Sequence, residues 1–364
     1  MPKVDRGKYY FVEFRHELVD PDPIYVEFED DRPFDNGGIA EVYNGKYEKQ
    51  NVAVKLIGKG TVQYPPNLIW RPTIDQILTD PKNEVKVLKE FDKYFNENKK
   101  VKRRIIQLID SGYVRKTDFL LRTNNYFAFI IIMELGEENF YKTMIKGFEE
   151  NAKSFYKFNE NALMKKLIEP IEVLIQIHKV AIHMDFKPQN LLYAKGKNSI
   201  LKAIDFGGSV LLRDNNGNRR NKIIVKNPTS SPYFLPPEIN WQYLDFIKDK
   251  IKKSSDKDKY SFERKFIDIN DNIIQIASTK TDSWEFGIMI LQMILLNDTA
   301  INYVGNSNWK KEIVETLSKI NNFYTNSEEW IEGGKEQMES FKSEIKLLLE
   351  IRIKYPILFL LLSV

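Results

Sequence analysis

Two short stretches of the sequence carry polar side chains whose spacing suits chemistry on a phosphate. The first is HMDFKPQN at positions 183–190, which places a carboxylate (Asp185), an ammonium (Lys187) and an amide (Asn190) in one loop. The second is DFG, whose Asp205 follows Asp185 by twenty residues and ends the apolar stretch LKAI. One carboxylate can orient a hydroxyl, an amide and a second carboxylate can hold Mg²⁺, and a cation can neutralise a moving phosphoryl group. This combination indicates phosphoryl transfer.

A lysine and a glutamate upstream extend the set. VAVK at positions 52–55 ends a predicted strand on Lys55, and Glu84 lies in the amphipathic segment that follows. In isolation Lys55 would be an ordinary surface lysine and Glu84 a solvent-facing position. Together with the two loops they predict an ion pair in which Glu84 holds Lys55 against the phosphates of a nucleotide. Before them, DNGGIAEV at positions 35–42 predicts a turn between two strands, with backbone amides that can lie over phosphates.

The elements that must position these residues change in kind along the chain. Short β-branched or aromatic runs separated by turn residues predict strands in the first half: YYFVEF, IYVEFED, EVYNGKY, NVAVKLI, RIIQLID and YFAFIIIME. One helix is predicted among them over residues 83–91, starting after Pro81. Helical spacing of apolar residues predicts a helix over 161–178, and a nearly continuous apolar run predicts a core helix over 284–296. A strand-rich half therefore meets a helix-rich half near residues 134–138.

Composition narrows the classes of function. With 364 residues, 42% hydrophobic and 29% charged, the chain matches a folded protein with a sizeable core. Its 55 Lys and Arg against 51 Asp and Glu leave a net charge of +4, too small to indicate a nucleic-acid partner. The absence of cysteine excludes disulfides, thiolate metal sites and cysteine nucleophiles.

The termini and two internal stretches lead to further expectations about secretion, membrane spans and insertions. No secretion signal is visible at the amino terminus, and the apolar run at 357–364 is far shorter than the roughly 20 residues of a bilayer span. We expect no membrane span and interpret this run as a buried helix end, with a membrane contact as the alternative. Residues 60–79 and 248–271 are interpreted as insertions, the second as a solvated surface segment.

Seven motifs of the sequence, taken in order, resemble the eukaryotic protein kinase superfamily, serine/threonine branch. They are Val42, VAVK, Glu84, HMDFKPQN, DFG, SSPYFLPPE at 230–238 and DSWEFG at 282–287, and they span roughly residues 30–300. The resemblance implies an α+β, bilobal protein kinase fold. Residues 1–136 would form a strand-rich N-terminal lobe with one regulatory helix and an N-terminal extension. Residues 137–364 would form a helical C-terminal lobe with an insertion near 240–275.

The resemblance also implies roles for individual residues, with ATP and Mg²⁺ as cofactors and serine or threonine hydroxyls of proteins as acceptors. Asp185 would be the catalytic base and Lys187 would steady the γ-phosphate, while Asn190 and Asp205 would bind the metal. Lys55, paired with Glu84, would contact the α- and β-phosphates. The nucleotide would lie among ten residues: Gly37, Gly38, Ala40, Val42, Ala53, Lys55, Met133, Glu134, Gly136 and Leu192. Lys187 and Ser231 match the serine/threonine pattern, in which Ser231 hydrogen-bonds the catalytic aspartate.

The sequence departs from the family pattern in two motifs. The positions of the three glycines in the glycine-rich loop hold Asp35, Gly37 and Ala40, and Asp35 would put a carboxylate near the phosphates, so we expect weakened nucleotide affinity. Met184 stands where the family has an arginine that holds a phosphorylated activation loop. We therefore expect an enzyme that does not need phosphorylation of this loop.

Two other functions are weighed against an active serine/threonine protein kinase. A pseudokinase scaffold, binding partners without catalysis, would fit the altered glycine loop and Met184. A small-molecule phosphotransferase with a kinase-like fold would not need the segment SSPYFLPPE. The expected partners are protein substrates, the insertions are candidate docking segments, and the expected location is intracellular, cytoplasmic or nuclear.

Overall fold

The computed structural model of the chain describes residues 10–16, 24–28, 33–36, 40–58, 74–114, 127–153, 159–195, 199–220, 223–226, 234, 236, 274–299 and 354. These residues belong to two compact units. The described parts of the first lie within Met1–Glu137 and Tyr193–Ser209. Those of the second lie within Glu138–Leu192, Val210–Lys259 and Asp268–Val364.

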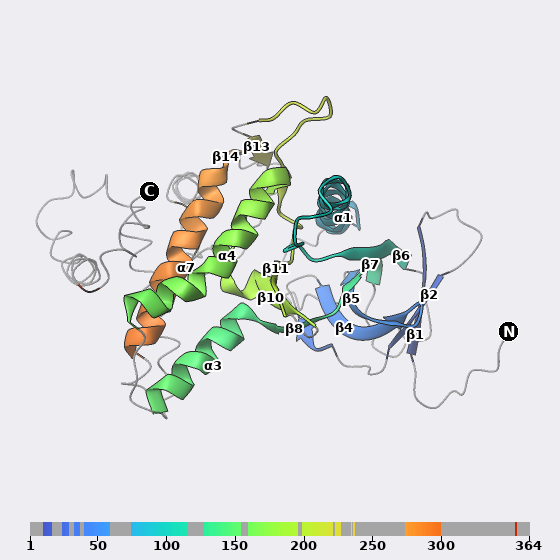
Figure 1. Cartoon of the computed structure of the whole chain (residues 1–364). Coiled ribbons are helices and arrows are strands. Elements are labelled where there is room, and N and C mark those ends of the chain that lie inside the picture. The colour runs from blue at the N-terminus through green and yellow to red at the C-terminus, as the bar shows by residue number, and fades with distance from the viewer. Residues whose placement is uncertain are drawn as a thin grey trace, which may run out of the picture. The chain divides into compact units, whose positions relative to one another are not determined.

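The first unit is built on an antiparallel sheet of seven strands. These are β1 (Tyr10–Arg15), β2 (Ile24–Phe28), β3 (Asp35–Asn36), β4 (Ala40–Tyr47), β5 (Gln50–Gly58), β6 (Leu108–Val114) and β7 (Phe127–Glu134). Their order is β2-β1-β6-β7-β5-β4-β3, and β2 also pairs with β4. The six strands from β2 to β4 in this order therefore form a closed barrel, with β3 appended to β4 (Figure 1). The six predicted strand regions are confirmed, although β6 begins four residues later than RIIQLID.

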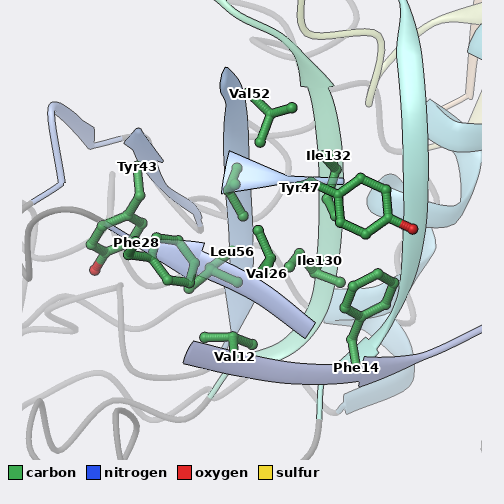
Figure 2. Close-up of a cluster of buried hydrophobic side chains, with 11 residues drawn as sticks. Val12, Phe14, Val26, Phe28, Tyr43, Tyr47, Val52, Leu56, Ile130 and Ile132 are labelled. Carbon is green, nitrogen blue, oxygen red and sulfur yellow. The ribbon is translucent and has the colours of Figure 1, made fainter. Parts of the chain in front are cut away.

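Alternation along each strand gives the barrel an apolar interior. Figure 2 shows this interior, where buried side chains from different strands meet. The buried cluster consists of Val12, Phe14, Val26, Phe28, Tyr43, Tyr47, Val52, Val54, Leu56, Ile130 and Ile132. The strand register explains the membership, because Tyr43, Val54 and Ile132 are directly paired across β4, β5 and β7 and so point to the same face.

Two glycines allow the barrel to close. A Cβ on Gly112 of β6 would lie 2.3 Å from the carbonyl oxygen of Arg15 in β1. A Cβ on Gly45 of β4 would lie 2.9 Å from the carbonyl oxygen of Glu27 in β2. Both distances are too short for a real carbon atom, so each seam between the N-terminal strands and the rest of the barrel requires a residue without a side chain.

Helix α1 (Ile74–Glu97) packs beside the barrel through one apolar face. Val85, Leu88 and Phe91 recur at helical spacing and are buried. The predicted helix is confirmed, but its predicted start was wrong, because Pro81 lies inside the helix and the last six residues of the supposed 60–79 insertion are helical. A proline removes a single amide donor, and the turns on either side continue through it.

The second unit is mainly helical. Its long helices are α3 (Phe140–Lys153), α4 (Glu160–Val180) and α7 (Thr279–Thr299), and α4 lies along α7 (Figure 1). The helices predicted over 161–178 and 284–296 are confirmed within α4 and α7. Asn159 starts α4, since its side-chain oxygen accepts the backbone N–H of Ala162 at 3.0 Å.

Short elements connect these helices. A 3₁₀ turn, η1 (Pro188–Asn190), follows α4, and antiparallel pairs join β9 (Ala181–Ile182) to β12 (Val210–Leu211) and β13 (Ile223–Lys226) to β14 (Ile274–Ala277). A further sheet of three strands has the order β11 (Leu201–Ala203), β10 (Leu191–Ala194), β8 (Gly136–Asn139); β11 belongs to the first unit, and β8 and β10 each contain residues of both units. The predicted insertion at 248–271 lies outside the described residues.

Candidate active site

Lys55, Glu84 and Asp205 meet in the first unit. The Nζ of Lys55, on β5, lies 2.8 Å from Oε2 of Glu84 on α1 and 2.8 Å from Oδ1 of Asp205. The Glu84 side chain is 2% exposed, whereas that of Asp205 is 47% exposed. One ammonium thus bridges a buried carboxylate and a carboxylate that solvent can reach.

Burial and charge act in opposite directions on this group. Burial disfavours the ammonium of Lys55, but attraction to Asp205 and Glu84 outweighs it, so the pKa of Lys55 is raised and the side chain stays charged. Burial raises the pKa of the Glu84 carboxyl, and the nearby Lys55 opposes that rise. Burying a charged pair brings little net stability, so this arrangement points to a functional site.

The candidate adenine and phosphate residues described in the first unit share one face of the sheet. Val42 pairs directly with Lys55, and Ala53 pairs directly with Met133. Directly paired residues point to the same side, and Ala53 and Lys55 are two apart on one strand, so all four side chains lie on the face opposite to the barrel interior. Ala40 is buried on the same strand as Val42. Gly37 and Gly38 lie outside the described residues.

The end of β7 is tied to the strand before Asp205. The backbone N–H of Glu134 donates to the carbonyl oxygen of Gln107 at 3.1 Å, so a hydrogen bond from Glu134 to an adenine would use its carbonyl. The Glu134 carboxylate forms an ion pair with Lys202 of β11, which is 8% exposed. Gly136 begins β8 close by in the chain, whereas Leu192 of β10 belongs to the second unit.

Asp185, Lys187 and Asn190 converge in the second unit. Lys187 Nζ lies 2.7 Å from Oδ2 of Asp185, and Asn190 Nδ2 donates to the same oxygen at 2.9 Å and to the Asp185 carbonyl at 2.8 Å. Asn190 is held by η1, whose proline start follows Lys187. A cation and an amide therefore fix the orientation of one carboxylate.

Two carboxylates of α7 hold the backbone of this loop. Asp282, which is 0% exposed, accepts the N–H of His183 at Oδ2 (2.8 Å) and that of Met184 at Oδ1 (2.9 Å). Glu285, one turn further along α7, accepts the N–H of Phe186 at 2.6 Å. Burial, and then repulsion from Asp282, raises the pKa of Glu285 well above its usual value. Three backbone amides of the loop, those of His183, Met184 and Phe186, are thus hydrogen-bonded to side chains of α7.

Met184 is buried in an apolar cluster. Its companions are Ile182, Leu212, Ile223 and Ala277, with Val210 packed against them. Its φ of +71° is uncommon for a residue with a side chain, and Asp205 in the first unit has a similar φ of +64°. Strained backbone of this kind tends to cluster at functional sites.

Comparison with known proteins gives the family. The protein kinase domain family matches residues 28–262, well over half of the chain. The chain belongs to the protein kinase domain family. It therefore has the bilobal kinase fold, and the resemblance seen in its motifs is confirmed.

The kinase domain has relatives among plant protein kinases. It is 30% identical over 207 residues to calcium-dependent protein kinase 7 of Arabidopsis thaliana. This match covers 56% of this chain and 30% of the relative. It is 29% identical over 204 residues to CDPK-related kinase 8 of the same plant, covering 55% of this chain and 26% of the relative. Calcium-dependent protein kinase 8 of Arabidopsis thaliana is 37% identical over 114 residues, 30% of this chain and 18% of the relative. The chain thus matches less than a third of the length of each of these relatives.

The structure of this kinase domain adds supporting residues that the sequence did not reveal. Asp282 and Glu285 lie at i and i+3 in the first turns of α7. DSWEFG was among the family motifs, but nothing in its sequence indicated that these two side chains hold the loop at 183–190. Lys202 and Glu134 are 68 residues apart, and no local pattern links them. Ser231, the predicted substrate-side residue, lies outside the described residues.

The residues of this kinase domain suit the cofactors that its family uses. Asn190 turns its Nδ2 towards Asp185, which leaves its oxygen as the donor for a cation, and Asp205 offers a carboxylate that solvent can reach. Oxygen atoms of this kind are the ligands that Mg²⁺ prefers. Within the described ranges, no helix is long and apolar enough to cross a bilayer.

Proposed function

We propose that the protein is a serine/threonine kinase that transfers the γ-phosphate of ATP to hydroxyls of protein substrates. The observation that carries the proposal is the contact of Lys55 with both Glu84 and Asp205, 2.8 Å from each. A cation held by two acidic groups from separate elements suits the binding of nucleotide phosphates beside a metal.

The candidate site residues of the first unit would together bind the nucleotide. Lys55 would contact the α- and β-phosphates, and Glu84 would keep its ammonium in place. Val42, Ala53 and Met133 would bind the adenine, with Ala40, Gly37 and Gly38 near the phosphates and backbone groups of Glu134 and Gly136 at the adenine edge. Leu192 would contribute from the second unit. When bound, Mg²⁺ held by Asn190 and Asp205 would neutralise charge on the phosphates.

Asp185 would act on the acceptor. Its carboxylate is oriented by Lys187 and Asn190, so it can accept the proton of a substrate hydroxyl. The hydroxyl oxygen would then bond to the γ-phosphorus as the bond from that phosphorus to the β–γ bridging oxygen breaks and ADP leaves. Lys187 would then balance charge on the transferred group. The serine/threonine assignment draws on Lys187, two residues after Asp185, and on Ser231. Use of ATP fits an intracellular location, cytoplasmic or nuclear.

The test is phosphoryl transfer by the full 364-residue chain. Purified protein, labelled ATP and Mg²⁺ are incubated with mixed protein substrates, and an Asp185→Asn variant serves as the control. We expect labelled serine and threonine with the wild type and labelling at least about a hundredfold lower with the variant. Labelled tyrosine alone would contradict the substrate class.

The same preparation separates the alternatives. Binding of ATP without transfer above the Asp185→Asn control would favour a pseudokinase scaffold. Transfer to small alcohols or amines in preference to proteins would favour a small-molecule phosphotransferase. If protein partners dock on the segment at 248–271, shortening that segment should weaken the binding of those partners.

A further inference from the structure

Asn83, the residue before Glu84 on α1, makes two hydrogen bonds to the segment that follows Asp205. Its Nδ2 donates to the carbonyl oxygen of Gly207 at 2.8 Å and to that of Ser209 at 2.8 Å. An amide side chain carries two N–H donors on its nitrogen, whereas its oxygen can only accept. Two carbonyl partners therefore fix which end of the amide faces the segment, and both donors are used on it.

The segment that Asn83 contacts has a backbone with unusual freedom. Gly207 and Gly208 stand side by side in the sequence, and a residue without a Cβ reaches conformations that others avoid. Asp205, two residues earlier, has a left-handed φ of +64°. A carboxylate on such a backbone keeps one direction only where neighbouring groups hold it.

Three residues of α1 hold successive parts of this segment, all within the first unit. The ring of Phe91 packs against that of Phe206, with 5.3 Å between centroids. The carboxylate of Glu84 accepts a hydrogen bond from the backbone of Phe206. Asn83 fixes the backbone beyond it, where the N–H of Ser209 also closes a turn onto the carbonyl of Phe206 at 3.1 Å. The Ser209 residue is buried, so this end of the segment is shielded from water.

We propose that Asn83 is a positioning residue for phosphoryl transfer, which holds residues 207–209 on α1 so that Asp205 stays directed at Lys55. The inference rests on the proposed function, because Asp205 is assigned there to the metal. Asn83 touches no reacting group and acts through the backbone that carries Asp205. Adjacent residues of one helix then set both partners of Lys55: Glu84 directly and Asp205 through Asn83.

The first test needs no nucleotide. Hydrogen exchange of residues 205–212 is measured in the full chain for the wild type, Asn83→Ala, Asn83→Asp and a control, Lys86→Ala, on the exposed side of α1. Loss of two hydrogen bonds should speed exchange in this segment by about tenfold in Asn83→Ala. Asn83→Asp should be faster still, because a carboxylate of the same shape would face two carbonyl oxygens. Asn83→Gln keeps both donors and should restore most of the protection.

The second test follows the cofactor. When the competent arrangement of Asp205 is less populated, the apparent affinity for Mg²⁺ falls by the same fraction. Half-maximal activity of Asn83→Ala should therefore need at least about threefold more Mg²⁺ than that of the wild type. Asn83→Gln should lie close to the wild type, and Lys86→Ala should match it. If Asn83 merely supported the helix, its substitution would not change the Mg²⁺ concentration needed for half-maximal activity. Asn83→Ala and Asn83→Gln would then not differ in this concentration.

Two results would overturn the proposal. One is exchange in residues 205–212 that is unchanged in Asn83→Asp. The other is a general loss of folding in Asn83→Ala, with β6 and β7 exchanging as fast as the segment, which would give Asn83 a role in the fold alone. If the wild type transfers no phosphate above Asp185→Asn, the proposed function fails, and the exchange comparison still decides what Asn83 does.

Discussion

Met184 donates its backbone N–H to Oδ1 of Asp282 at 2.9 Å, while its side chain is buried beside Ile223. The backbone of the loop at 183–190 is therefore fixed at Met184 by a carboxylate, while an apolar cluster surrounds the Met184 side chain. Ile223 lies on β13, beyond Asp205 in the chain, and β13 is itself paired with β14. Packing and strand pairing hold this stretch without any charged group at position 184, which is consistent with the expected independence from phosphorylation.

Replacing Met184 with arginine should destabilise the protein. A guanidinium placed among Ile182, Leu212, Ile223 and Ala277 would lose its hydration without a partner, so we expect the free energy of unfolding to fall by about 3 kcal/mol or more. The control Met184→Leu should cost less than about 1.5 kcal/mol, since volume and polarity are kept. Urea unfolding measures both, and equal stability of the two variants would mean that the cluster is open to water.

Replacing Lys55 with methionine should abolish activity and spare the fold. Without the ammonium, Glu84 is a buried carboxyl with a raised pKa, and it can take up a proton in place of its lost partner. We expect labelled-phosphate transfer to fall by about a thousandfold. The control Lys86→Met, on the exposed side of the same unit, should stay fully active. Thermal unfolding monitors the fold, and wild-type turnover in Lys55→Met would contradict the assignment of the phosphate lysine.

Replacing Gly112 with alanine should strain the closed barrel. The new Cβ would meet the carbonyl oxygen of Arg15 at 2.3 Å, and relief requires β1 to move away from β6. We expect a loss of about 2–4 kcal/mol in the free energy of unfolding. The matched control is Gly147→Ala on α3, where the nearest atom is 3.8 Å away and the substitution should stabilise by up to about 1 kcal/mol. A neutral effect of Gly112→Ala would show that the strands can separate at little cost.

Replacing Glu285 with glutamine should change how stability depends on pH. The folded protein raises the pKa of Glu285, mainly through burial, so it binds a proton that the unfolded chain has released. Wild-type stability should therefore fall as pH rises from about 4.3, the pKa of an unfolded glutamate, to the higher folded pKa. The glutamine can still accept the Phe186 N–H and should lack this fall. Urea unfolding of both proteins from about pH 4 to 8 measures this. If the difference in unfolding free energy between Glu285→Gln and the wild type does not widen as pH rises, the shift belongs to another group.

Local patterns could predict part of the site, and long-range pairing determined the remainder. VAVK, HMDFKPQN and DFG each lie on one short element, so their spacing already groups the candidate residues. The strands and α4 follow from the local pattern of apolar residues, and α7 follows from its nearly continuous apolar run. The contacts of Asn83 and Asp282 join segments about a hundred residues apart. DSWEFG marks Asp282 as part of a family motif but does not indicate its partners, and nothing local distinguishes Asn83 from an ordinary polar position. The start of α1 was mispredicted because a proline reads as a boundary even where the helix passes through it.

The closed barrel also sets an order of events during synthesis. Strand β1 is made before β6, and Phe14 pairs with Val114, a hundred residues further along. Until β6 has left the ribosome, the edge of β1 that pairs with β6 stays unsatisfied, and such an edge is prone to pair with other chains. Closing so large a loop is slow, so this edge of β1 depends on protection while the chain is still growing.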